Sequence, residues 1–340
     1  MNYPYKILLI FFLVASGCSL FGDDDNNEKE KEYAFNFSQE KNFDFRPITG
    51  VYIDSKNREM VATWEGLTLN IDGGYFSYVS IEETQKVRKI IEFGGTYYAS
   101  SNDGDIFLKS DNGINWEVFA NPNGRTYDFI MLKSGRLLIG GINGVFYKDQ
   151  GSDVITKREF FFAGQYTTNS IDHLIETSSG AVLAGTHDGI YRSLDKGETW
   201  NKVSNNISKH QDEISMFFKT ESGIILAGHS DLFYRSSDNG NTWGAMTLPD
   251  SYPKKMIASG GIEYILLSEK IWARKEGTIP FIPLEIEKFL GETFNENGPF
   301  QIYDFYIKGN TIIVYKDIYP NGIFIGHKNS KADIWDDLEN

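Results

Sequence analysis

This 340-residue chain has polar and ionisable side chains in its short loops. Usually one or two such residues follow each apolar run. Such side chains can hydrogen-bond to sugar hydroxyls or to a peptide, although tight loops also need these residue types. These side chains indicate binding of a ligand, and the sequence identifies no catalytic residue among them. The candidates for a binding face are Asn102, Asp103, Arg125, Asn143, His187, Asp188, His229 and Asp231.

The five histidines do not indicate a metal site. His187 and His229 occupy matching loops one position out of register, and no pair has the i, i+4 spacing of a helical zinc site. None of the phosphate-loop or nucleophile motifs occurs in the sequence. We expect no metal and no cofactor, and an enzyme is the less favoured class.

A turn motif, S-x-D-x-G-x-T-W, repeats along the chain and must organise the elements that carry these loops. It is complete at 193–200 and at 236–243, and a third copy at 109–116 keeps its Asp, Gly and Trp. The Asp can accept backbone N–H bonds within its own turn, the Gly supplies positive φ, and the Trp covers apolar surface. These roles are structural. We refer to the motifs as Asp-boxes; their fixed residues are Asp111, Gly113, Trp116, Asp195, Gly197, Trp200, Asp238, Gly240 and Trp243.

The spacing of the Asp-boxes predicts an all-β fold, a single β-propeller of four-stranded blades. Asp195 and Asp238 lie 43 residues apart, and Asp111 and Asp195 lie 84 apart, which leaves room for one worn unit. A period of about 40–45 residues with several short strands is typical of propeller blades. Seven units fit best, within a range of six to eight, and the last is expected to end near 332–335. The expected second strands are Met60–Thr63, Tyr97–Ser100, Leu137–Gly140, Val182–Gly185, Ile225–Gly228, Tyr264–Leu267 and Ile312–Tyr315.

In a propeller, the loops between second and third strands open on one face near the centre, and the Asp-box turns lie on the other side. The binding-face candidates belong to the first face. Because the Asp-boxes occupy the other side of the ring, a binding site is expected on the face that carries the loops between second and third strands.

The repeats after residue 45 resemble the BNR/Asp-box superfamily, which includes sialidases, xyloglucanase-type glycoside hydrolases and photosystem II assembly-factor-like propellers. The assembly-factor-like proteins match best in size and imply a single seven-bladed binding domain. A sialidase-like exo-glycosidase is the alternative, and its arginine triad would have to recruit residues such as Arg46, Arg88 and Arg125. The order Phe45-Arg46-Pro47-Ile48 departs from the sialidase Arg-Ile-Pro motif.

The N-terminal segment indicates export and lipid anchoring. Lys6 precedes an apolar run at 7–15 that is too short to span a bilayer, and Ala15-Ser16-Gly17-Cys18 follows it. This resembles a bacterial lipobox and implies cleavage before Cys18, the single cysteine, and lipidation there. We expect a signal peptide at 1–17, a lipidated Cys and acidic tether at 18–32, and the propeller at 33–340. The tether resembles an export signal for the outer membrane, with surface exposure left open.

The formal net charge of −14 disfavours nucleic acid as a partner. The sequence thus predicts an envelope lipoprotein that binds a protein partner or a glycan without catalysis. Two alternatives remain: the sialidase-like glycosidase, and a scaffold in an envelope complex.

Overall fold

The computed structural model describes most of the chain from residue 35 to residue 328. The described residues are 35–39, 48–64, 66–70, 76–79, 81, 87–101, 106–159, 170–203, 213–214, 216–229, 232–250, 252–278, 280–284, 302–316 and 322–328. No helix in these ranges is long and apolar enough to cross a membrane. The predicted signal peptide and tether lie outside them, as do Asn102, Asp103 and Asp231 of the predicted binding face.

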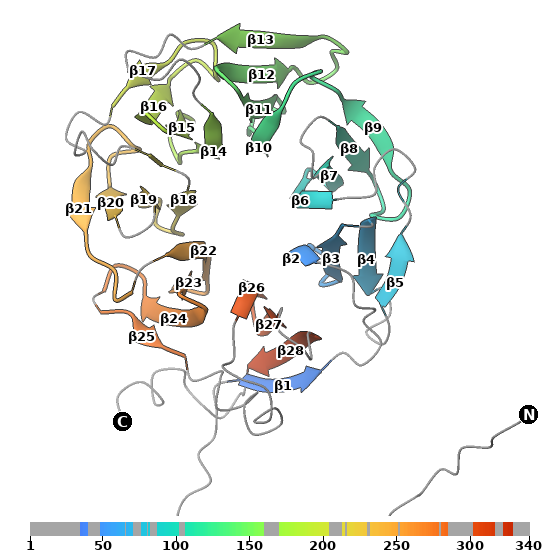
Figure 1. The fold of residues 1–340 in the computed structure, drawn as a ribbon, viewed down its shortest axis with the longest axis vertical. Helices are drawn as coiled ribbons and strands as arrows, with labels where there is room; N and C mark the ends of the chain where they lie inside the picture. Colours follow the sequence, from blue (N-terminus) through green and yellow to red (C-terminus); the bar gives the residue numbers. More distant parts are fainter. Residues whose placement is uncertain are drawn as a thin grey trace, which may run out of the picture.

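The described strands form seven four-stranded antiparallel sheets, which Figure 1 shows around a ring. The first strand of each sheet lies nearest the centre. The sheets are β2(Ile48–Ile53) β3(Glu59–Thr63) β4(Gly66–Asn70) β5(Phe76–Val79); β6(Val87–Phe93) β7(Thr96–Ser101) β8(Phe107–Ser110) β9(Glu117–Ala120); β10(Thr126–Met131) β11(Leu137–Gly141) β12(Gly144–Lys148) β13(Ile155–Glu159); β14(Ile171–Glu176) β15(Val182–Thr186) β16(Gly189–Ser193) β17(Asn201–Lys202); β18(Met216–Lys219) β19(Ile225–His229) β20(Leu232–Ser236) β21(Gly244–Met246); β22(Pro253–Ser259) β23(Ile262–Leu267) β24(Lys270–Lys275) β25(Ile282–Pro283); and β26(Ile302–Lys308) β27(Thr311–Lys316) β28(Gly322–Lys328) with β1(Phe35–Gln39).

The two ends of the chain share one sheet, an arrangement that the sequence did not indicate. Only six sheets consist of four consecutive strands; the remaining sheet combines β26–β28 with β1. β1 pairs antiparallel with β28 from Phe35↔Lys328 to Gln39↔Phe324. The outer strand of this sheet thus comes from the beginning of the domain. Hydrogen bonds between the first and last strands close the ring without leaving an open sheet edge. The segment 332–335, expected to end the last unit, lies outside the described residues.

The second strands are short apolar runs, as the sequence predicts, and three of them are buried along their whole length. β11, β15 and β23 are buried at every position. Leu183 of β15, for example, packs with Phe217, Ile225 and Trp243 of the next sheet. The core is therefore a series of apolar layers between the blades.

The two complete Asp-boxes form the predicted turns between third and fourth strands. In each, one Asp oxygen accepts two backbone N–H bonds, from Glu198 and Thr199 to Asp195 and from Asn241 and Thr242 to Asp238, at 2.8–3.1 Å. The second oxygen accepts the Thr hydroxyl, at 2.6 and 2.7 Å.

In the third copy, Asp111 does not have the role that the sequence predicts for it. Asn112 Oδ1 accepts the N–H groups of Ile114 and Asn115, while Asp111 accepts the Thr96 hydroxyl at 3.0 Å. The reason is that this turn is one residue shorter between its Ser and its Gly. Ser110 Oγ binds Gly113 N, whereas Ser193 Oγ binds Gly197 N.

Each Asp-box turn also holds the preceding blade through an arginine. Arg58, Arg136 and Arg192 donate to the backbone carbonyls of Asn112, Lys196 and Asn239, at 3.0–3.1 Å. Each carbonyl belongs to the residue just before the Asp-box Gly. The turns thus fasten neighbouring blades, and they lie at the sheet end opposite the loops between second and third strands.

Candidate binding site at the centre of the ring

Most first strands carry a repeated irregularity, which places one side chain from each of six sheets at the loop end of the ring. Six of them skip one residue in their pairing with the second strand. A residue left out of the ladder is a β-bulge, which redirects its side chain. We call these residues the bulge ring; they are Thr49, Arg88, Tyr127, Asp172, Lys254 and Tyr303.

Part of the bulge ring lines a cavity of about 580 Å³. The cavity spans four neighbouring first strands, β22, β26, β2 and β6, and its walls include Thr49, Arg88, Lys254 and Tyr303. Tyr52 and Tyr306 lie deeper and pack edge to face, with ring centroids 5.1 Å apart. A cavity of this size suits a small ligand or one segment of a larger one.

The four cations that line the cavity fall into two classes. Lys89 Nζ lies 2.5 Å from Asp128 Oδ1, and Lys255 Nζ lies 2.9 Å from Asp304 Oδ1, so both are neutralised. Arg88 and Lys254 are exposed and have no carboxylate within ion-pair distance among the described residues. These two can therefore attract an acidic group of a ligand.

The carboxylates of these two ion pairs also accept a backbone N–H group from each of two first strands. Asp304 Oδ2 accepts the N–H of Val51 at 3.1 Å, and Asp128 Oδ2 accepts the N–H of Leu174 at 2.8 Å. Burial raises the pKa of Asp128, but Lys89 and His173 outweigh this and hold it below its usual range. Both N–H groups are therefore unavailable to a ligand, which favours recognition by side chains over addition of a strand.

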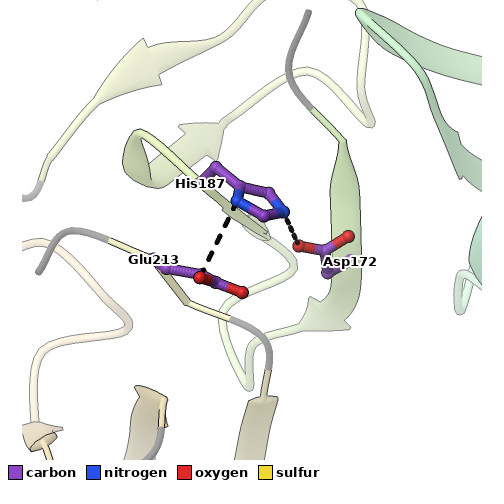
Figure 2. Close-up of side chains that lie close together, drawn as sticks. All are labelled: Asp172, His187 and Glu213. Carbon is purple, nitrogen blue, oxygen red and sulfur yellow. Dashed lines mark ion pairs between the residues drawn. The ribbon is translucent and has the colours of Figure 1, made fainter. Parts of the chain in front are cut away.

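On the other side of the ring, the structure brings together two histidines and two carboxylates. His187 Nε2 lies 3.3 Å from Asp172 Oδ2, and His187 Nδ1 lies 3.7 Å from Glu213 Oε2. Figure 2 shows the imidazole ring of His187 between these two carboxylates. His229 Nδ1 lies 3.4 Å from Glu213 Oε1. We call Asp172, His187, Glu213 and His229 the histidine cluster.

The histidine cluster was not indicated by the sequence, from which we expect no metal set among the histidines. One ligand atom each from Asp172, His187 and Glu213 lie within 4.8 Å of one another. Burial raises the pKa of Asp172 more than a hydrogen bond from Ser170 and the nearby His187 lower it. The sequence missed the set because its members come from four separate strands or connections of two adjacent blades.

The remaining predicted binding-face residues have different surroundings. The carboxylate of Asp188 is buried and accepts bonds from Tyr191 OH at 2.5 Å and Lys202 Nζ at 2.9 Å, so it stabilises its own blade. Asn143 adopts φ 58° in the tight turn between β11 and β12. Arg125 is exposed, with its guanidinium 5.4 Å from the centre of the Tyr127 ring.

Sequence reasoning did not single out the bulge ring, although a signal for it exists. Each member is the second residue of a first strand, so the residues recur at the same strand position in six of the seven sheets. The residues at the starts of the first strands differ from blade to blade. Which residue is skipped is seen only in the pairing of the first strand with the second.

Comparison with known proteins gives a family and a set of structures with the same fold. The family model of the DUF6242 beta propeller domain matches residues 76–282. No curated protein matches the chain. Virginiamycin B lyase from Staphylococcus aureus, solved with quinupristin, is 13% identical with a TM-score of 0.66, covering 88% of this chain and 100% of the lyase.

Two further structures are similar. The extracellular domain of the hybrid two-component system protein BT4673 from B. thetaiotaomicron is 12% identical with a TM-score of 0.67; the match covers 89% of this chain and 44% of that domain. YCF48 bound to D1 peptide is 12% identical with a TM-score of 0.60, covering 88% of this chain and 96% of YCF48. At such identities the likeness shows the fold alone.

Proposed function

This chain belongs to the DUF6242 beta propeller domain family, and we propose that it is a non-catalytic binding protein of the bacterial envelope. Its ligand is a peptide segment of a protein partner or a glycan, and in either case it carries acidic groups. The ligand binds at the loop end of the ring, over the cavity between β22, β26, β2 and β6.

The observation that carries this proposal is the placement of Arg88 and Lys254. Both occupy bulge positions on the wall of the cavity, and neither is neutralised by a carboxylate among the described residues. Beside them, Tyr303 is 46% exposed, and its ring centre lies 5.6 Å from Lys254 Nζ. Two cations beside an exposed aromatic ring suit a ligand that combines acidic groups with an apolar face.

Structures of similar fold support binding without identifying the ligand. YCF48 is bound to D1 peptide, and virginiamycin B lyase was solved with quinupristin. BT4673 contributes an extracellular domain. A propeller can therefore serve as a binding domain, and some propellers of this fold belong to envelope proteins.

The sialidase-like alternative needs three arginines around one substrate carboxylate. Among the described residues that line the cavity, Arg88 is the one arginine, and Arg46 lies outside the described ranges. The described site has two cations that can bind an acidic group, and we do not propose glycosidase activity for it.

The anchoring proposal rests on the sequence alone. Cys18 and the acidic stretch after it lie outside the described residues. We propose that lipidated Cys18 attaches the propeller to the outer membrane and that the tether at 18–32 lets the loop face meet its ligand. A scaffold in an envelope complex would use the same anchor.

The test is to present the purified domain, residues 33–340, to an array of acidic and neutral glycans and to use it for affinity purification from a native envelope extract. We expect retention of acidic ligands, weakened by added salt because exposed charges are screened. Failure to retain any acidic glycan or peptide would overturn the proposal.

A further inference from the structure

The N···O contacts within the histidine cluster are longer than ordinary hydrogen bonds. The N···O separations are 3.3 Å between His187 and Asp172, 3.7 Å between His187 and Glu213, and 3.4 Å between His229 and Glu213. Hydrogen bonds from nitrogen to oxygen are usually 2.7–3.2 Å long. Asp172 Oδ2 is buried and forms no hydrogen bond among the described residues; its ion-pair contact there is with His187 Nε2 at 3.3 Å. A buried carboxylate oxygen without a donor is costly unless something else binds it.

The contact between His187 Nε2 and Asp172 Oδ2 fits two ligands of a single metal ion, while Glu213 faces the other ring nitrogen, Nδ1. Zinc binds imidazole nitrogen and carboxylate oxygen at about 2.0–2.2 Å, which places neighbouring ligand atoms of a tetrahedral site roughly 3.4 Å apart. The His187–Asp172 separation of 3.3 Å already matches this edge. Glu213 lies within 4.8 Å of both and must approach by roughly 1 Å.

The bulge explains why Asp172 can reach His187. Asp172 has no partner in the pairing of β14 with β15, so its side chain leaves the regular alternation and turns toward the end of β15. His187 lies in the turn just after β15, and Glu213 precedes β18 of the next blade. The two blades thus supply ligands from both sides of one junction (Figure 2).

We propose that Asp172, His187 and Glu213 bind a divalent transition-metal ion of the zinc type. Imidazole with carboxylates favours zinc over magnesium or calcium, which prefer oxygen ligands alone. His229 acts as a positioning residue, because its Nδ1 faces the other oxygen of Glu213. Three protein ligands leave a fourth position open at the loop end of the ring, where an acidic ligand group could join the metal. Metal binding by itself does not depend on the proposed function.

The experiment is calorimetric titration of Zn²⁺ into chelator-treated protein at pH 7.5, with Mg²⁺ and Ca²⁺ as separate titrants. We expect one strong zinc site per chain and no comparable site for the other two ions. Asp172→Asn and His187→Gln should each weaken zinc binding by more than about 100-fold, since even loss of an outer partner costs roughly 10- to 100-fold. His229→Gln should weaken it less, as expected for a residue that only positions Glu213.

Matched controls separate this site from zinc bound elsewhere on the surface. Asp153, with a fully exposed side chain, is changed to Asn, and His327 on β28 is changed to Gln. Both controls should bind zinc as the wild type does, and thermal unfolding in chelator verifies that every variant is folded. Zinc binding that is absent, or that survives Asp172→Asn and His187→Gln, overturns the inference. Binding of acidic ligands by metal-free protein would leave the proposed function intact.

Discussion

The carboxylates of Asp195 and Asp238 are used entirely within their own turns, so the most recognisable residues of this sequence are structural. Sequence reasoning could predict this because the bonds are local, spanning three or four residues. It could not predict that Arg136 and Arg192 bind the same turns from the preceding blades, because those partners are 60 and 47 residues away.

The glycines of the Asp-boxes are the most sensitive single positions in these turns. A Cβ on Gly240, which has φ +77°, would lie 2.5 Å from Leu183 Cδ1 of the preceding blade. We expect Gly240→Ala to lower the free energy of unfolding by about 2–5 kcal/mol, through backbone strain and overpacking. Gly244→Ala is the matched control, since a Cβ there meets nothing within 4 Å. Equal urea midpoints for the two variants would contradict the packing account.

The Asp-box carboxylates should also make the fold sensitive to acid. Burial raises the pKa of Asp238, but hydrogen bonds from Thr242, Ser236 and Asn241 lower it from 3.8 to about 2. Because the folded value is the lower one, ionised Asp238 stabilises the fold above about pH 4, and this is lost as the pH falls toward 2. In urea titrations, Asp238→Asn should be less stable than wild type at pH 7, with the difference shrinking below pH 4. A difference that does not change with pH would refute this assignment; Asp153→Asn is the control.

At the scale of elements, the expected second strands coincide with β3, β7, β11, β15, β19, β23 and β27. They were predictable because each is a short, continuous apolar run between turn residues. The bulges of the first strands could not be located from the sequence, since a bulge is defined by the pairing with the neighbouring strand. For the same reason the sequence did not reveal that β1 pairs with β28.

Ring closure by β1 gives an element-scale prediction. Deleting the mature chain through Gln39 removes the strand that pairs with β28 over five residues. We expect a loss of about 2 kcal/mol or more, which lowers the melting temperature by roughly 4–8 °C. A matched deletion through Ala34 keeps β1 and should melt as the full domain does. If both deletions melt alike, the closing sheet is assigned incorrectly.

At the scale of the whole molecule, charge is distributed unevenly around the ring. The chain carries a formal charge of −14, yet Arg88 and Lys254 line the cavity on one side of the ring, and Asp172 and Glu213 belong to the histidine cluster on the other side. An acidic ligand is therefore repelled by most of the surface and attracted at one place. The sequence predicted the loop face, but only the fold shows which blades carry the cations.

The attachment of the molecule to a membrane is a separate whole-molecule prediction. If Cys18 is lipidated, Cys18→Ser should move the protein from the membrane fraction to the soluble fraction, because a short apolar leader alone does not anchor it. Fractionation followed by immunoblotting measures this directly. Continued membrane association of the variant would contradict anchoring through a lipid on Cys18.

A binding site at the centre of the ring is tested most directly by the affinity of an acidic ligand, chosen from the array, for a protein that lacks Arg88 and Lys254. Each charge-assisted contact contributes about 1.5–3 kcal/mol, or roughly tenfold or more in affinity. Calorimetry should show Arg88→Gln/Lys254→Gln binding about 100-fold more weakly or worse. The control Lys56→Gln/Lys157→Gln, which changes two exposed lysines away from the cavity, should match wild type. Unchanged affinity in the first variant, or equal losses in both, would contradict a binding site at the centre of the ring.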